Sequence, residues 1–207
     1  MSTPSMETQP NVAPQPNRWR TALPLGLFAL LLVVLVAGLV HAPTKDLIPS
    51  PLVGKAVPQF SIPNLTAGAG PVSSDQLKGH WSLVNVWGSW CANCRDEHAT
   101  LLMIKQQGRV PIVGIDWNDD DADAINWLQQ LGNPYAEVGE DHDGRAAIAW
   151  GAYGAPESFL VNPQGIIVYK QIGEITPEAW RDQFLARIDA ADSSGAGGKQ
   201  RPAAAGG

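Results

Sequence analysis

The sequence predicts an α/β domain built on a mixed sheet, preceded by a single helix able to span a membrane. Three observations support this prediction. Short β-prone runs alternate with amphipathic stretches between residues 59 and 190, residues 21–40 carry no charge, and apolar residues make up 44% of the chain, which is ordinary for a protein with a buried core.

Composition excludes several classes of function. The 207 residues carry a net charge of −6, so the chain lacks the basic face that a nucleic-acid-binding protein needs to neutralise phosphates. The chain has two cysteines, too few for a disulfide-stapled scaffold, a four-cysteine zinc site or a four-thiolate iron–sulfur cluster. Any chemistry based on sulfur must therefore come from one cysteine pair.

The first forty residues predict where the protein lies in the cell. Residues 1–20 read as a disordered cytoplasmic N-terminus that is rich in Pro, Ser, Thr, Gln and Asn and ends with Arg18 and Arg20. Residues 21–40 follow as a transmembrane helix, since twenty helical residues span about 30 Å, and basic residues before the span place the N-terminus inside the cell. A cleaved signal peptide and a buried soluble helix are the alternatives, although the run is longer than a usual signal core.

The remaining segments frame one folded domain. Residues 41–58 hold four prolines and predict an extended tether, and residues 191–207, mostly Ala, Gly and Ser, predict a disordered tail. Residues 59–190 are then left for one exported domain.

The first half of this domain reads as strand, helix, strand and helix. The run 82–87 predicts a strand, and the amphipathic stretch that begins at Cys91 predicts a helix that ends near Gly108. The run 110–116 predicts a second strand. Acidic residues 119–123 then supply a cap for a helix that is closed at residues 132–134 by Gly-Asn-Pro.

The second half reads as a hairpin and a helix. The apolar runs 158–161 and 166–169 flank Asn-Pro-Gln-Gly, whose Pro and Gly favour a turn. Thr176 followed by Pro177 predicts the start of a last helix, because proline is favoured at the first helical position.

The pair Cys91 and Cys94 is the predicted chemical centre. A helix that opens at Cys91 directs free N–H groups and partial positive charge at this sulfur, which lowers the pKa of the thiol and makes it nucleophilic. Arg95 adds positive charge. Two cysteines one turn apart can close a disulfide, and we expect only the first to face solvent. Cys91 would then attack a client disulfide, and Cys94 would resolve the mixed disulfide.

Two other uses of the pair remain open. A static disulfide is possible in an exported protein, but so short a loop constrains the unfolded chain little. Cys91, Cys94 and His98 could bind copper(I) or zinc, although no fourth ligand is evident. Covalent haem attachment is excluded because residue 95 is arginine rather than histidine.

Several segments together resemble one family. Val-Asn-Val-Trp-Gly-Ser-Trp-Cys-Ala-Asn-Cys-Arg-Asp-Glu-His at 84–98 resembles the active site of exported thioredoxin-like proteins. The segments Gly-Asn-Pro-Tyr at 132–135 and Tyr-Gly-Ala-Pro-Glu at 153–157 narrow this resemblance to the DsbE (CcmG) family of membrane-anchored thiol:disulfide interchange proteins, which serve cytochrome c maturation. The resemblance covers roughly residues 54–184 and implies a thioredoxin-like fold.

The resemblance also implies residue roles. Pro156 matches the cis-proline of the fold, which would leave the backbone of Ala155 to pair with an extended client, although an ordinary trans proline is the alternative. Glu97 and Glu157 match acidic catalytic positions. A partly buried Glu97 could accept the Cys94 proton, and a solvated surface carboxylate is the plainer interpretation of either residue.

Other positions bear on client contact and redox potential. Trp90 is expected to cover the disulfide, whereas Trp87 and Phe159 belong in the core. Ala92 and Asn93, expected at the client-binding surface, replace a dipeptide in which the family commonly has proline first, so the family's reduction potential does not carry over. Gly88 stands where alanine is more usual, and we expect the change to be harmless.

The acidic run 119–123 lacks the glycine and terminal glutamate of a calcium loop, so we interpret it as a solvated helix start. Residues 141–144 read as a turn. No metal and no cofactor are expected.

These inferences converge on an enzyme held at the bacterial inner membrane by residues 21–40, with its catalytic domain in the periplasm. It would reduce client disulfides, and the resemblance suggests a DsbD- or CcdA-like membrane protein as electron donor. The expected clients are apocytochrome c, through its Cys-x-x-Cys-His pair, or its maturation partners. The alternatives are a general exported thiol oxidoreductase and a copper-binding chaperone module that uses Cys91, Cys94 and His98.

Overall fold

The computed structural model describes residues 18–40 and 51–196, in two units that divide between Thr44 and Lys45. The segments 1–17, 41–50 and 197–207 lie outside the described residues, and with them most of the predicted N-terminal, tether and tail segments.

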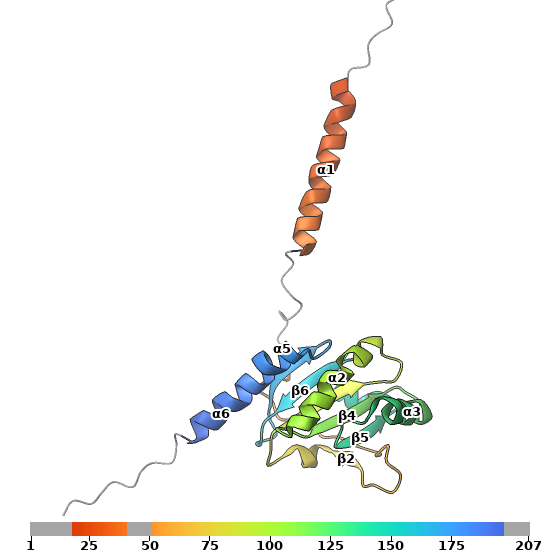
Figure 1. Ribbon diagram of the computed structural model, residues 1–207, viewed down its shortest axis with the longest axis vertical. Coiled ribbons are helices and arrows are strands. Elements are labelled where there is room, and N and C mark those ends of the chain that lie inside the picture. Colours follow the sequence, from red (N-terminus) through yellow and green to blue (C-terminus); the bar gives the residue numbers. More distant parts are fainter. Residues whose placement is uncertain (1–17, 41–50, 197–207) are drawn as a thin grey trace, which may run out of the picture. The chain divides into compact units, whose positions relative to one another are not determined.

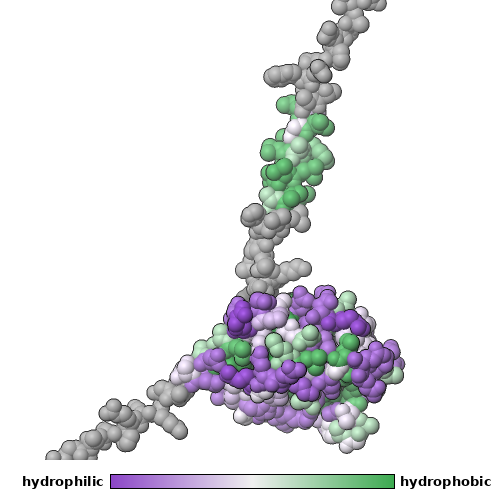
Figure 2. All heavy atoms as spheres, viewed as in Figure 1, coloured by the Kyte–Doolittle hydropathy of each residue, from purple (hydrophilic) through white to green (hydrophobic). Residues whose placement is uncertain are grey.

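The first unit contains one helix, α1 (Arg18–Val40), with Pro24 near its start. Its described side chains, at residues 23–38, are exposed and apolar (Figure 2). Within the described part of the chain, no helix is long and apolar enough to cross a membrane.

The second unit is built on a five-stranded sheet of order β5-β4-β3-β6-β7 (Figure 1). Strands β3 (Ser82–Trp87), β4 (Ile112–Trp117) and β5 (Glu137–Asp141) are parallel. Strand β6 (Glu157–Val161) runs antiparallel to β3, and β7 (Ile167–Ile172) runs antiparallel to β6. The predicted mixed sheet and hairpin are therefore confirmed.

The helices begin and end where capping residues predict. Helix α2 (Ala92–Gln107) follows Cys91 as N-cap and ends at Gly108, whose φ of 63° lies in the left-handed region that glycine favours. Helix α3 (Asp121–Leu131) is capped by Asp120, whose carboxylate accepts from the Ala122 N–H at 2.9 Å. Thr176 caps the last helical run in the same way.

Strand β3 is buried along its whole length because both faces of the sheet are covered. Leu83 and Trp87 pack in the core under α2 and α3, whereas Val84 and Val86 pack in a second core with α4 (Arg145–Ala149). Trp87 and Phe159 are core residues, as predicted. Side chains alternate along a strand, so Asn85 is brought to the same face as Leu83 and Trp87, toward α2.

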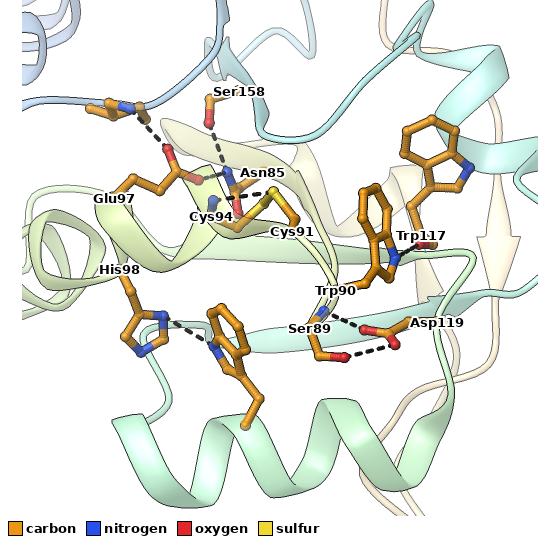
Figure 3. Close-up of a disulfide and its surroundings, with 12 residues drawn as sticks. Asn85, Ser89, Trp90, Cys91, Cys94, Glu97, His98, Trp117, Asp119 and Ser158 are labelled. Carbon is orange, nitrogen blue, oxygen red and sulfur yellow. Dashed lines mark hydrogen bonds between the residues drawn. A yellow bond between two sulfur atoms is a disulfide. The ribbon is translucent and has the colours of Figure 1, made fainter.

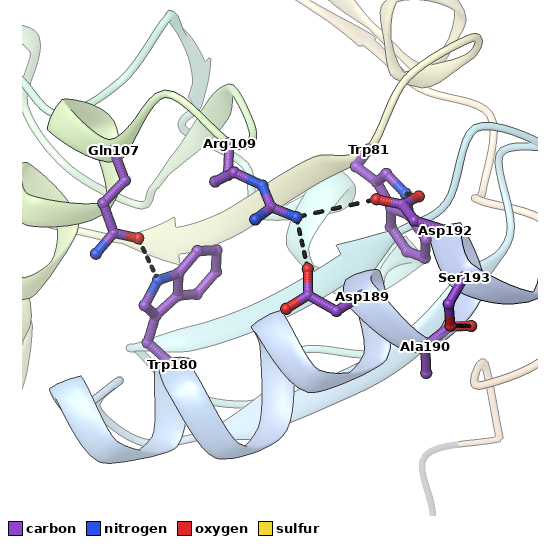
Figure 4. Close-up of polar contacts among 8 residues, drawn as sticks. All are labelled: Trp81, Gln107, Arg109, Trp180, Asp189, Ala190, Asp192 and Ser193. Carbon is purple, nitrogen blue, oxygen red and sulfur yellow. Dashed lines mark hydrogen bonds and ion pairs between the residues drawn. The ribbon is translucent and has the colours of Figure 1, made fainter. Parts of the chain in front are cut away.

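The last helical run extends into the predicted tail. It comprises α5 (Pro177–Ala179), the π-helical turn η2 (Trp180–Leu185) and α6 (Ala186–Ala196). Arg109 contacts Asp189 at 2.7 Å and Asp192 at 3.9 Å, and the Trp81 indole donates to Asp192 (Figure 4). Helix α6 thus covers the first six residues of the segment expected to be a disordered tail.

Part of the predicted tether also belongs to the folded unit. Val57 is buried, and the Gly54 N–H donates to the Ile167 carbonyl at 2.8 Å. The remaining elements, which the sequence did not predict, are the small hairpin of β1 (Ser61–Ile62) and β2 (Val72–Ser73), the 3-10 turn η1 (Ser74–Leu77), and β5 and α4.

Candidate active site

The two cysteines form a disulfide at the N-terminus of α2, with their Cα atoms 5.2 Å apart (Figure 3). Cys91 is the N-cap of the helix, and its Sγ accepts from the Cys94 N–H at 3.1 Å. This is the position in which helix N–H groups stabilise a thiolate. Cys91 is only 5% exposed, so in the oxidised form the expected solvent-facing sulfur is almost as buried as Cys94.

Glu97 is a fully buried carboxyl on the same helix. It accepts from the Asn85 side-chain N–H at 2.9 Å and from the Ile175 backbone N–H at 2.8 Å. Burial raises the pKa of Glu97 to about 7, although both hydrogen bonds lower it. The interpretation of Glu97 as a solvated surface acid is therefore wrong, and its carboxyl can exchange a proton near neutral pH.

Asn85 connects Glu97 to two further buried side chains that the sequence reading missed. Its Nδ2 also donates to the Ser158 hydroxyl at 2.9 Å, and its Oδ1 accepts from the Tyr135 hydroxyl at 2.8 Å. Tyr135 ends the Gly-Asn-Pro-Tyr segment, and Ser158 lies on β6 beside the predicted cis-proline. Asn85 could have been recognised in the sequence, because it is a polar residue in an otherwise apolar strand.

The Ala155–Pro156 peptide bond is cis, as the resemblance implied. Pro156 is buried, and Ala155 packs against the core cluster that contains both cysteines. Ala92 and Asn93 are exposed in the first turn of α2. Ala92 and Asn93 thus lie between the two cysteines on α2, and Ala155 packs against the core cluster that contains them.

Glu157 is fully buried too, but its charge is already paired. Its carboxylate lies 2.7 Å from the Lys170 Nζ and accepts from the Tyr153 N–H at 3.2 Å. A solvated surface position is therefore wrong for Glu157. Its contacts hold it to Lys170 and to the loop before β6.

Trp90, expected to cover the disulfide, is 53% exposed and is held by Trp117. Its indole N–H donates to the Trp117 carbonyl at 3.1 Å, and the two ring centroids lie 6.0 Å apart in a T-shaped arrangement (Figure 3). A Cβ on Gly88 would lie 2.4 Å from the Trp90 Nε1. An alanine at residue 88 would therefore displace this indole, so glycine at this residue sets the position of Trp90.

Asp119 holds the loop that leads into the cysteines. Its carboxylate accepts from the Ser89 hydroxyl at 2.8 Å and from the Ser89 backbone N–H. The interpretation of the acidic run as a helix start is right for Asp120, whereas Asp119 binds the active-site loop instead. Nearby, burial and the charge of Asp119 raise the pKa of Asp116 to about 8.

His98 is not placed to bind metal together with the cysteines. Its Nε2 lies 2.9 Å from the Gly132 carbonyl, and its Nδ1 lies 3.4 Å from the Trp127 indole nitrogen, so neighbours occupy both ring nitrogens. Among described residues, the group of three side chains close enough to hold a metal is Asp121, Glu140 and His142, and it contains no cysteine. The geometry gives no support to the copper-binding alternative.

Comparison with known proteins agrees with this geometry. Residues 53–170 match the model of the AhpC/TSA family. The thiol:disulfide interchange protein DsbE of Allochromatium vinosum is 44% identical over 80% of this chain and 90% of its own length. DsbE of Pseudomonas aeruginosa is also 44% identical, over 78% and 88%, and DsbE of Escherichia coli K12 is 41% identical, over 65% and 73%.

Solved structures show the same fold. A Chlorobium tepidum crystal structure described as a thiol:disulfide interchange protein DsbE matches with a TM-score of 0.56 and 25% identity, over 66% of this chain and 97% of that one. A disulfide bond at the start of a helix, on a thioredoxin-like α/β fold, is the active centre of a disulfide oxidoreductase. The chain belongs to the DsbE family of thiol:disulfide interchange proteins.

Proposed function

We propose that this protein reduces client disulfides in cytochrome c maturation, from a position tethered to the bacterial inner membrane with its catalytic domain in the periplasm. The observation that carries the proposal is the presence on one helix of the capping Cys91 and of the buried carboxyl of Glu97, three residues after Cys94. This arrangement supplies a nucleophile and a proton acceptor for the two steps of disulfide exchange.

In the first step the Cys91 thiolate attacks one sulfur of the client disulfide. A mixed disulfide forms between Cys91 and the client, the client S–S bond breaks, and the other client sulfur leaves as a thiolate. Helix N–H groups, including that of Cys94, stabilise the attacking thiolate and favour this step near neutral pH.

In the second step Cys94 resolves the mixed disulfide. Glu97, as a carboxylate, takes the proton of the Cys94 thiol. The Cys94 thiolate then attacks the Cys91 sulfur and expels the second client thiolate. The client gains two electrons, and the protein is left as the Cys91–Cys94 disulfide. A pKa of about 7 suits Glu97 for this role, because a base works best when its pKa is near the working pH.

Client binding is assigned to the surface around the disulfide. The backbone of Ala155, next to the cis-proline, would pair with an extended client segment. Exposed Trp90, Ala92 and Asn93 would contact the residues that flank the client cysteines.

The resemblance to DsbE proteins supports the choice of client and electron donor. Apocytochrome c, or a maturation protein that holds it, offers a Cys-x-x-Cys-His pair that must be reduced before haem attaches. In an oxidising compartment the dithiol needs a continuous supply of electrons, which a DsbD- or CcdA-like membrane protein would provide. Residues 21–40, without a charge and preceded by two arginines, support membrane tethering.

A trapping experiment tests the proposal. Cys94→Ala removes the resolving thiol, so a client should remain covalently bound to Cys91 and be released by dithiothreitol. We expect apocytochrome c or a cytochrome maturation protein among the adducts, and none with Cys91→Ala as the matched control. Adducts with unrelated exported proteins only would instead indicate a general thiol oxidoreductase.

A further inference from the structure

Lys170, on β7, is a buried cation. Its side chain is 4% exposed, and its Nζ lies 2.7 Å from the carboxylate of Glu157, which is 1% exposed. Two charges removed from water need good mutual geometry and further hydrogen bonds, and removal of one partner leaves an uncompensated buried charge. The other contacts of Lys170 and Glu157 therefore indicate which part of the fold this ion pair keeps in place.

Both members of the pair bind the loop between Trp150 and β6. Lys170 Nζ donates to the Gly151 carbonyl at 2.9 Å, and the Glu157 carboxylate accepts from the Tyr153 N–H at 3.2 Å. The loop is thus fixed at two backbone positions, and the Ala155–Pro156 cis bond follows directly after them.

Lys170 also lies against two aromatic rings. Its Nζ is 4.6 Å from the centroid of Tyr153 and 5.2 Å from that of Phe159. Phe159 is fully buried, whereas Tyr153 is 69% exposed. A cation–π contact therefore connects the buried cation to an aromatic side chain on the outer surface of the loop.

We propose that Lys170 is a positioning residue for polypeptide clients. With Glu157, it fixes the 151–156 loop so that the Tyr153 ring and the Ala155 backbone are already in place when a client segment binds. A loop that must become ordered on binding loses affinity, whereas a pre-ordered loop does not. The proposal rests on the proposed function in one respect, that the client is a polypeptide which pairs beside the cis-proline.

The test compares a polypeptide disulfide with a small one. Reduced full-length protein is mixed with an oxidised Cys-x-x-Cys-His peptide or with 5,5′-dithiobis(2-nitrobenzoic acid), which is too small to need the loop. For Lys170→Met we expect kcat/KM for the peptide, relative to the rate with the small disulfide, to fall by about tenfold, mainly through KM. Lys170→Arg, which keeps the charge, should recover most of this ratio.

Two further variants separate positioning from folding. Lys78→Met is the matched control, since Lys78 forms an exposed ion pair with Asp75 at 2.8 Å, and it should leave the ratio unchanged. The double variant Lys170→Met/Glu157→Gln removes the unpaired buried charge that could unfold Lys170→Met. It should fold and still show the lowered ratio.

The proposal would be overturned if the double variant kept the parent's ratio of peptide to small-disulfide reactivity. It would also be overturned if Lys170→Met lost equal activity toward the peptide and the small disulfide. Failure of the parent protein to reduce the Cys-x-x-Cys-His peptide would instead contradict the proposed client. In that case insulin with its native disulfides serves as the polypeptide substrate. The ratio of kcat/KM for insulin to the rate with the small disulfide then decides whether Lys170 positions the loop.

Discussion

The side-chain amide of Asn85 donates to the carboxylate of Glu97 across 2.9 Å, and both residues are buried between the sheet and α2. Asn85 lies on β3, six residues before the first cysteine, and Glu97 lies three residues after the second. One hydrogen bond therefore connects the strand and the helix on either side of the disulfide, and it involves the carboxyl that we propose as the base in resolution.

Glu97→Gln should slow resolution without preventing attack by Cys91. The amide cannot accept the Cys94 proton, so the mixed disulfide should persist longer, by about 10²-fold at neutral pH as is typical for loss of a general base. Rapid-quench measurement of the mixed disulfide with a model peptide checks this. Parental kinetics in the variant would show that Cys94 loses its proton elsewhere.

The same substitution should change how stability depends on pH. Burial raises the pKa of Glu97 from 4.5 to about 7, so the folded state binds its proton more tightly than the unfolded state. The associated stability is present below about pH 4.5 and is lost as pH rises through about 7, an effect on the order of 3 kcal/mol. Asp116, with its pKa raised to about 8, contributes in the same direction.

Urea unfolding at pH 5 and pH 8 provides the measurement. The parent should lose more stability over this interval than Glu97→Gln, which keeps only the loss that arises from Asp116 and from groups with smaller shifts. Equal losses in the two proteins would show that Glu97 does not titrate in this range.

Asn85→Ala should move the titration of Glu97 to higher pH. Loss of the amide donor removes one of the two hydrogen bonds that favour the carboxylate, so the pKa of Glu97 should rise above its value of about 7. The pH midpoint of the resolution step should move up with it, as seen in single-turnover rates between pH 5 and 9. Ser158→Ala, which removes a different partner of Asn85, is the control and should move the midpoint less.

Gly88→Ala should displace Trp90. The added methyl group would meet the indole nitrogen at 2.4 Å, so the ring must leave its hydrogen bond to the Trp117 carbonyl. We expect a change in tryptophan fluorescence and a destabilisation of about 1 kcal/mol, the usual net contribution of the one hydrogen bond that breaks. In a Trp90→Ala background, Gly88→Ala should lower the free energy of unfolding only slightly. An equal loss of stability in that background would show that the added methyl group clashes with a residue other than Trp90.

Asp119→Ala should loosen the loop that leads into the cysteines. It removes both hydrogen bonds from Ser89, which we expect to cost about 1–3 kcal/mol because the Ser89 N–H loses its partner. The negative charge that helps to raise the pKa of Asp116 is also lost, so that pKa should fall. Asp123→Ala, in the same acidic run, is the control for denaturant unfolding. A parental free energy of unfolding for Asp119→Ala would argue against this contact.

Much of the fold could be predicted because its signals are local. Strand β3, the capped helices α2 and α3, and the β6–β7 hairpin follow from apolar runs, capping residues and turn residues. Strand β5 was missed because its sequence, Glu-Val-Gly-Glu-Asp, carries three acids and one large apolar residue. Its pairing with β4 and the packing of Ile62 against Gly139, where a Cβ would lie 2.4 Å from Ile62 Cδ1, are tertiary contacts with no local signal.

The same division holds for the site. The two cysteines stand out by motif and spacing, and Glu97 and Pro156 were identified through the family resemblance. Lys170, Tyr135 and Asp119 could not be recognised in the same way, because their partners are 13, 50 and 30 residues away and only the folded sheet makes them neighbours.

The reduction potential of the Cys91–Cys94 pair tests the central claim most directly, by equilibration of the protein against glutathione redox buffers. A dedicated reductant predicts a value near or below about −200 mV, toward glutaredoxin and thioredoxin. A value near about −120 mV, as for the oxidant DsbA, would contradict the proposal, because electrons would then flow from client to protein.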